Sequence, residues 1–197
     1  MKIIQKIPKK WLIFIWILVV HLMGLLDYTL MVPLIPNITK TIGIPASQGG
    51  LWVSICALTM GITALVLSPL SDMLGRRKTL LIGLSILMIS ACFCGMAQNF
   101  WTLIILRGVS GVGWALILPT VIGYISDLFE SEKRAMVLGI DLAFSFFAVI
   151  IGVPIYTYIA QESSWRITFL FHSFCLCFVV LLTFLIPKNP TKIVSTP

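Results

Sequence analysis

The sequence predicts an all-α, polytopic membrane protein with six transmembrane helices. Hydrophobic residues make up 59% of the 197 residues and charged residues only 11%, and the mean hydropathy is +1.06, whereas globular domains are about one-quarter charged. A helix needs about 20 apolar residues to cross the hydrocarbon of a bilayer. Stretches of that length lie between charge clusters at 11–36, 48–70, 79–97, 100–125, 136–160 and 165–187.

These stretches are continuous apolar runs, without the alternating segments of about ten residues that are typical of barrel strands. Every backbone polar group inside a bilayer must be hydrogen-bonded, so continuous runs favour helices. The first stretch follows a lysine-rich start, as in a signal peptide. Its apolar run exceeds about 15 residues and lacks a small-residue cleavage pattern, so we expect it to be retained as a helix.

Positive charges predict the orientation. Among the loops of one side only Lys40 and Arg166 are basic, while the other side holds Lys2, Lys6, Lys9, Lys10, Arg76, Arg77, Lys78, Lys133, Arg134, Lys188 and Lys192. Positive loops stay in the cytoplasm during insertion, so both chain ends are expected there. The net charge of +7 therefore flanks membrane spans, and a nucleic-acid partner is not expected.

The five cysteines, at positions 56, 92, 94, 175 and 177, all lie within the expected spans. Residues two apart on a helix point in different directions, so we expect packing rather than disulfides or a metal site. The sequence also shows no nucleophile–base pair, phosphate loop or metal spacing. Neither enzymatic activity nor a cofactor or metal is expected.

The stretch "SPLSDMLGRRK", 68–78, lies in the loop between the second and third spans. Gly75 suits a tight turn, and Asp72, Arg76 and Arg77 are placed to bind neighbouring helix ends. The stretch resembles the signature loop of the major facilitator superfamily, from which it departs at two positions. Serine replaces the opening glycine, and methionine replaces the basic residue after the aspartate.

This resemblance implies a conformational latch, in which the aspartate and arginine of the loop contact helix ends and release them when the cavity opens inward. Asp127, in "YISDLFESEKRAM" at the end of the fourth span, matches the acidic position that the family places beside this loop, and Arg134 follows closely. Ordinary positive-inside topology would explain the basic residues alone. It does not explain Asp72 and Gly75 at this spacing.

Three further motifs resemble the family's drug and proton antiporters. "LDYTLMVPLIPNI" in the first span has the aspartate, aromatic, threonine and two-proline pattern, and "RGVSGVGWALILPT" in the fourth has an intramembrane arginine followed by glycines. "GVPIYT", with "SSWRITF" after it, resembles the glycine–proline turn of the fifth helix, formed here by Gly152 and Pro154, although Tyr156 stands where the family often has glycine. The resemblance implies two inverted three-helix repeats, half of a twelve-helix fold.

Asp27 and Arg107 are charges inside the membrane, which makes them a functional-site hypothesis. Asp27 lies about 13 Å and Arg107 about 12 Å below the outer end of its helix, at 1.5 Å per residue. We therefore expect them to face each other across the cavity, with protonation or substrate binding breaking the pair. A permanent ion pair that only fixes helix packing is the alternative.

Arg107, Gly111 and Trp114 share one helical stripe, which could receive a flat or cationic ligand. Close helix contact at the glycines is the alternative. Asp141 is expected to face the inner gate or the signature loop, or to be a solvated helix-end carboxylate. His21 is expected to serve packing, although a proton relay is possible, and His172 is expected to be peripheral.

Together these features predict a secondary transporter, or its amino-terminal half, that exports a small molecule or drug in exchange for protons. The resemblance implies a multi-pass protein of the bacterial inner membrane whose partners are its substrate, protons and the lipid bilayer. Residues 188–197 read as a cytoplasmic tail or the start of a linker to a carboxyl-terminal half. A homodimer is equally compatible, and an inactive remnant or membrane interaction partner is the alternative function. The cargo is not predicted.

Overall fold

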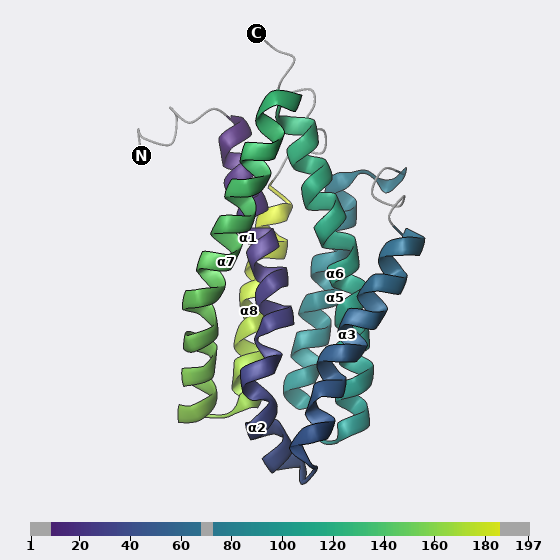
Figure 1. The fold of residues 1–197 in the computed structure, drawn as a ribbon, viewed down its shortest axis with the longest axis vertical. Helices are drawn as coiled ribbons and strands as arrows, with labels where there is room; N and C mark the ends of the chain where they lie inside the picture. Colours follow the sequence, from purple (N-terminus) through teal and green to yellow (C-terminus); the bar gives the residue numbers. More distant parts are fainter. Residues whose placement is uncertain (1–8, 68–72, 186–197) are drawn as a thin grey trace.

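The computed structural model describes residues 9–67 and 73–185, and these form an elongated bundle of helices (Figure 1). No strand occurs in these two ranges. The helices that define the bundle are α1 (Lys9–Thr29), α2 (Met31–Ile42), α3 (Ala46–Leu67), α5 (Arg76–Met96), α6 (Phe100–Leu128), α7 (Ser131–Glu162) and α8 (Trp165–Thr183).

Six segments of this described part are long and apolar enough to cross a membrane. α1 and α2 together form the first, Lys10–Ile42, and α3, α5, α6, α7 and α8 form one each. The helix continues past the approximate end that the sequence predicts at Pro36, which lies inside α2. α2 ends at Ile42, and the following Gly43 has a φ of 78°, a left-handed conformation that glycine adopts without strain.

Local sequence signals set several other helix ends. The Asn99 side chain accepts a hydrogen bond from the Thr102 backbone N–H and caps α6, and the Ser164 hydroxyl caps α8 through the Arg166 N–H. Gly75, with φ 87°, forms the turn before α5. This turn agrees with the tight bend that the sequence predicts there.

The fifth expected span contains no turn at its glycine and proline. α7 continues as one helix from Ser131 to Glu162, with Pro154 inside it. Gly152 serves packing, since a Cβ atom at this position would lie 2.7 Å from Leu26 Cδ2 of α1. The predicted glycine–proline turn is therefore replaced by a continuous helix that comes close to α1 at Gly152.

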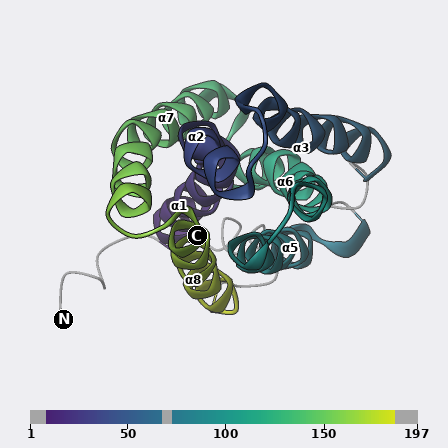
Figure 2. The same cartoon turned by 90° about the horizontal axis from the view of Figure 1, so that it is seen from below.

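Viewed along the bundle, α1 and α6 lie toward the middle, with α3, α5, α7 and α8 around them (Figure 2). α3 and α7 are the least covered of the six spans, since only 11% and 17% of their most apolar windows are buried, against 44–56% for the other four. One long side of each is therefore open to lipid or to another protein.

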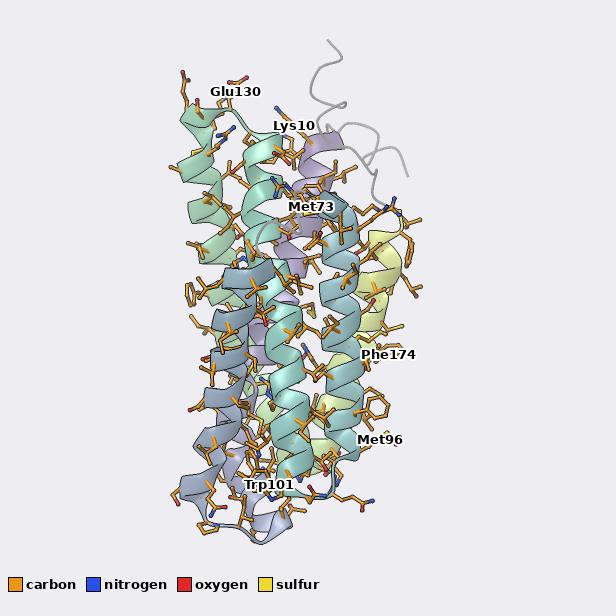
Figure 3. The ribbon with its side chains drawn as sticks, turned by 90° about the vertical axis from the view of Figure 1, so that its right-hand side faces the viewer. Lys10, Met73, Met96, Trp101, Glu130 and Phe174 are labelled. Carbon is orange, nitrogen blue, oxygen red and sulfur yellow. The ribbon has the colours of Figure 1, made fainter. Side chains whose placement is uncertain are left out.

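The loops alternate between the two ends of the bundle. Figure 3 shows Lys10, Met73 and Glu130 near one end and Met96 and Trp101 near the other. The start of α1 and the end of α8 lie toward the same end, because Trp16 of α1 donates a hydrogen bond to Thr183 of α8. The six spans thus cross back and forth, as the charge pattern of the loops predicts.

Candidate functional site

Asp27 and Arg107 form a buried ion pair between α1 and α6. Arg107 Nη1 lies 3.0 Å from Asp27 Oδ2, and the two side chains are 0% and 3% exposed. Arg107 Nη2 also donates to the backbone carbonyl of Asp27 at 3.1 Å. The contact that the estimated depths predict is present, and its burial gives it a strength that a solvated pair does not have.

Two serines extend the pair into a polar cluster. Ser110, one turn after Arg107 on α6, donates to Asp27 Oδ2 at 3.1 Å and accepts from Arg107 Nη1 at 3.2 Å. Ser90 of α5 lies 3.5 Å from the Ser110 hydroxyl and donates to the backbone carbonyl of Leu106. The hydrogen bonds of Ser110 to both charged side chains lower the free-energy cost of burying the two charges.

The first membrane-spanning helix is interrupted close to Asp27. α1 ends at Thr29 and α2 begins at Met31, two residues before Pro33, which lacks the N–H that a helix would use. The Asp27 carbonyl lies at this interruption, where it accepts the second hydrogen bond from Arg107. The aspartate is therefore held through both its side chain and its backbone.

His172 of α8 is a member of this site that the sequence analysis placed at the periphery. It is fully buried, its Nδ1 lies 3.0 Å from the Tyr156 hydroxyl of α7, and its Nε2 lies 3.7 Å from Asp27 Oδ1. Neither Nε2 nor Oδ1 has a hydrogen-bond partner in the described part of the chain. A small movement of α8 would therefore bring the histidine into contact with the aspartate.

His21 and Asp141 form a second buried contact, between α1 and α7. His21 Nδ1 lies 2.6 Å from Asp141 Oδ2, and the residues are 3% and 2% exposed. The expectation of a solvated helix-end carboxylate is wrong, because α7 packs against α1 and covers it. The His21 ring also stacks on Trp114 of α6, with ring centroids 5.7 Å apart and planes 26° apart.

Gly111 does not line a gap. A Cβ atom at this position would lie 2.3 Å from the backbone carbonyl oxygen of Cys56 and 2.1 Å from Thr59 Oγ1, both on α3. Trp114 is 5% exposed, and its ring occupies the space beside Gly24, where a Cβ atom would lie 2.0 Å away. The stripe of Arg107, Gly111 and Trp114 is thus filled by protein, as the helix-contact alternative supposes.

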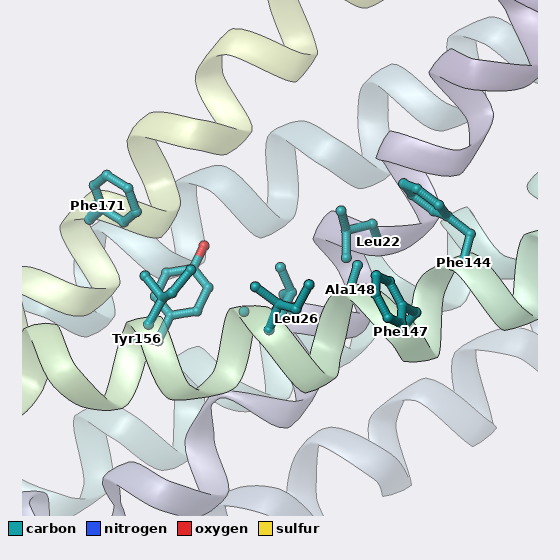
Figure 4. A pocket seen from close by; sticks show the side chains of 10 residues that line it. Leu22, Leu26, Phe144, Phe147, Ala148, Tyr156 and Phe171 are labelled. Atoms are coloured by element: carbon teal, nitrogen blue, oxygen red, sulfur yellow. The ribbon is translucent and has the colours of Figure 1, made fainter.

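An apolar pocket of about 410 Å³ lies between α1, α7 and α8 (Figure 4). The Tyr156 ring forms part of its wall, and its hydroxyl reaches His172. The pocket is therefore connected to Asp27 through one tyrosine and one histidine. Its other labelled lining residues are Leu22, Leu26, Phe144, Phe147, Ala148 and Phe171.

The basic residues of the signature loop contact two other helices. Arg76 Nε donates to Asp127 Oδ2 of α6 at 3.1 Å, as the family resemblance implies. Arg77 donates to the carbonyls of Thr183 and Phe184 at the end of α8. Gly75 makes the turn that precedes both arginines, and Asp72 lies outside the described residues.

Arg134 has a different contact from the one its sequence position suggests. Its Nε donates to the backbone carbonyl of Phe129, at 3.1 Å, in the short connection between α6 and α7. This bond satisfies a carbonyl at the end of α6. Arg134 therefore stabilises the connection, and Asp127 is paired with Arg76.

A family model described as Major Facilitator Superfamily matches residues 17–197. The chain belongs to the major facilitator superfamily. Its relatives in this superfamily include the multidrug transporter protein MdtP of Bacillus subtilis, which is 30% identical over 165 residues, or 83% of this chain and 30% of MdtP. Multidrug resistance protein 3 of the same organism is 30% identical over 75% of this chain and 29% of its own length.

Solved structures of transporters share the fold. A bacterial homologue of the human lysosomal transporter Spinster, in an inward-facing state, matches with a TM-score of 0.82 and 17% identity over 93% of this chain and 44% of that one. The xylose transporter XylE from E. coli matches with a TM-score of 0.80 and 15% identity over 95% and 52%. The chain thus has the fold of about half of a major facilitator transporter, and it spans less than a third of the two Bacillus relatives.

Proposed function

We propose that this chain forms the amino-terminal six-helix half of a secondary transporter that exports a small, largely apolar molecule in exchange for protons. The observation that carries the proposal is the Asp27–Arg107 pair, buried in the middle of the bundle. An intramembrane pair costs several kcal/mol to bury and marks a functional site more often than a structural one.

The pair supplies a site at which a proton and a substrate can exclude each other. While Asp27 is ionised, it neutralises Arg107 and holds α1 against α6. Protonation of Asp27 removes its charge, weakens the contact and frees the arginine. The unpaired Oδ1 atom of Asp27 faces His172, so His172 is the candidate that delivers a proton to Asp27 or takes one from it.

The pocket supports an apolar cargo. A cavity of about 410 Å³ falls within the roughly 300–1,000 Å³ of small-molecule sites, and its walls are aliphatic and aromatic side chains. Two of the curated relatives carry multidrug names. Since the Tyr156 ring lines the pocket, cargo there would touch the residue that contacts His172.

The exposed sides of α3 and α7 support a partner bundle. A full alternating-access machine of this family encloses its substrate between two six-helix halves, and the two least-covered helices of this chain are available for that contact. We propose that a carboxyl-terminal half or a second copy of the chain packs there. The loop charges favour cytoplasmic chain ends. The Bacillus subtilis relatives favour a bacterial inner membrane, with lipid around the remaining helices.

The test is proton-driven dye efflux from liposomes. The wild-type chain, alone and together with a carboxyl-terminal six-helix half, is reconstituted with ethidium as cargo and an imposed pH gradient. We expect gradient-dependent efflux that Asp27→Asn abolishes and Glu132→Gln retains, because Glu132 is an exposed carboxylate at the start of α7. If Asp27→Asn exported the dye at the wild-type rate, the coupling role of Asp27 would be refuted. If the wild-type chain exported no dye, either alone or with a carboxyl-terminal half, the proposed transport would be refuted.

A further inference from the structure

The second buried pair, His21 with Asp141, lies outside the site described above. Its 2.6 Å contact joins α1 to α7, and neither residue takes part in the Asp27–Arg107 cluster. The two side chains are 4% and 2% exposed. A titratable contact of this kind inside a membrane bundle requires a physical reason, because ionisable side chains are costly there.

Other ionisable groups do not neutralise Asp141. On α1, Asp27 lies six residues after His21. On α6, Arg107 lies seven residues before Trp114. Asp27 and Arg107 are paired with each other. On α8, His172 contacts Tyr156 and faces Asp27.

The charges at the ends of the neighbouring helices are also occupied. On α7, Arg134 lies about two turns before Asp141 and donates to a backbone carbonyl. On α5, Arg76 contacts Asp127 and Arg77 contacts the end of α8. In the described part of the chain, His21 is therefore the residue that directly faces the Asp141 carboxylate.

Burial makes this carboxylate dependent on the histidine. Asp141 Oδ1 and the Ser145 hydroxyl, one turn further along α7, are fully buried and have no hydrogen-bond partner among the described residues. An ionised carboxylate in such surroundings needs an opposite charge. The 2.6 Å separation is close to the short, roughly 2.7–2.9 Å distances of charge-assisted N–H···O bonds.

An aromatic ring also lies against the imidazole of His21. Its ring lies parallel to the Trp114 indole at stacking distance, and an aromatic face attracts a cation. In the tautomer that carries its hydrogen on Nδ1, this atom donates to Asp141 and Nε2 is left to take up the proton. Nε2 makes no hydrogen bond within the described residues.

We propose that His21 and Asp141 form a second proton-binding site, separate from Asp27. The neutral imidazole donates from Nδ1–H to the Asp141 carboxylate, and the incoming proton binds to Nε2 without breaking that bond. The loaded pair is neutral overall and ties α7 to α1. The unloaded pair carries one negative charge, which the apolar surroundings do not compensate, so the proton stays bound until water or a cation reaches the site.

The experiment is ¹⁵N NMR of the chain labelled only at histidine, in detergent micelles. The sequence has two histidines, so His172→Gln assigns both signals. We expect His21 to show two protonated ring nitrogens at neutral pH. A neutral His21 with one protonated nitrogen at neutral and mildly acidic pH would overturn the proposal and leave an ordinary hydrogen bond. Once His172→Gln has assigned the two signals, the wild-type spectrum decides between these outcomes, independently of transport.

A matched pair of variants tests the role of the carboxylate. In Asp141→Asn the ratio of charged to neutral His21 at neutral pH is expected to fall about tenfold or more, since an opposite charge at contact distance is removed. In Asp127→Asn, which removes a carboxylate paired with Arg76, the His21 signal is expected to remain as in wild type. A charged His21 that persists in Asp141→Asn would show that the carboxylate does not hold the proton.

Discussion

Removing the charge of Asp27 is expected to destabilise the folded chain strongly, because Arg107 would remain buried without its partner. Arg107 is fully buried, and its Nη atoms lie near Asp27 Oδ2, the Asp27 carbonyl, the Ser110 hydroxyl and Cys56 Sγ. In Asp27→Asn the backbone carbonyl, the serine and the cysteine remain. One amide oxygen also replaces the carboxylate as an acceptor, so the main loss is charge compensation.

The magnitude follows from this inventory. Breaking a buried pair by removing one partner costs about 3–5 kcal/mol, and the retained acceptors place Asp27→Asn near the lower end. A loss of about 3 kcal/mol lowers the ratio of folded to unfolded chain by about a hundredfold. The assay is reversible unfolding in mixed detergent micelles, followed by tryptophan fluorescence, with the free energy of unfolding compared between variants.

A double variant separates charge from packing. Asp27→Asn with Arg107→Gln removes both charges, and we expect it to be more stable than Asp27→Asn alone, because no unpaired charge remains. Glu132→Gln is the control, expected within about 0.5 kcal/mol of wild type as an exposed substitution. If Asp27→Asn matched the control in stability, Arg107 would not depend on Asp27 and the buried-pair reasoning would be refuted.

Three further predictions concern other contacts. Gly111→Ala is expected to cost about 1–3 kcal/mol of unfolding free energy, because its Cβ would overlap the α3 backbone; Gly139→Ala, with open space at that position, should cost nothing in the same assay. Tyr156→Phe removes the hydroxyl that contacts His172 and should lower stability by about 1 kcal/mol, with a change in the His172 NMR signal as its specific readout. Asp127→Asn breaks a half-exposed pair, so its cost should be at most about 1 kcal/mol and should shrink as salt rises.

The sequence predicted two contacts between oppositely charged residues, Asp27 with Arg107 and Arg76 with Asp127, and the structure contains both. Asp27 and Arg107 could be paired from the sequence because helix rise converts residue number into depth, and a buried charge has few alternatives to a partner. Arg76 and Asp127 could be paired because the family resemblance implies the contact. In both cases the chemistry of the residue restricts its neighbours.

The residues placed wrongly were those whose neighbours depend on helix rotation. His172 was expected to be peripheral because the sixth helix of the family is peripheral, and sequence alone does not show which side of α8 faces α1. Tyr156, at a position where the family often has glycine, carries the hydroxyl that contacts His172. Asp141 was expected to face the inner gate or the signature loop, or to meet solvent, because its depth on α7 is shallow, but it contacts His21. An acidic residue five positions inside a predicted span was the signal that a buried partner should be sought.

The sequence by itself determined the class of this protein and its six spans, and it predicts the cytoplasmic side and the charged residues inside the membrane. These properties follow from transfer free energies and from helix length, which act on each segment separately. Only the tertiary structure decided that His21 contacts Asp141, that α3 occupies the space beside Gly111 and that His172 faces Asp27. Those contacts depend on how six helices rotate and cross, and that arrangement is set by the packing of all of them together.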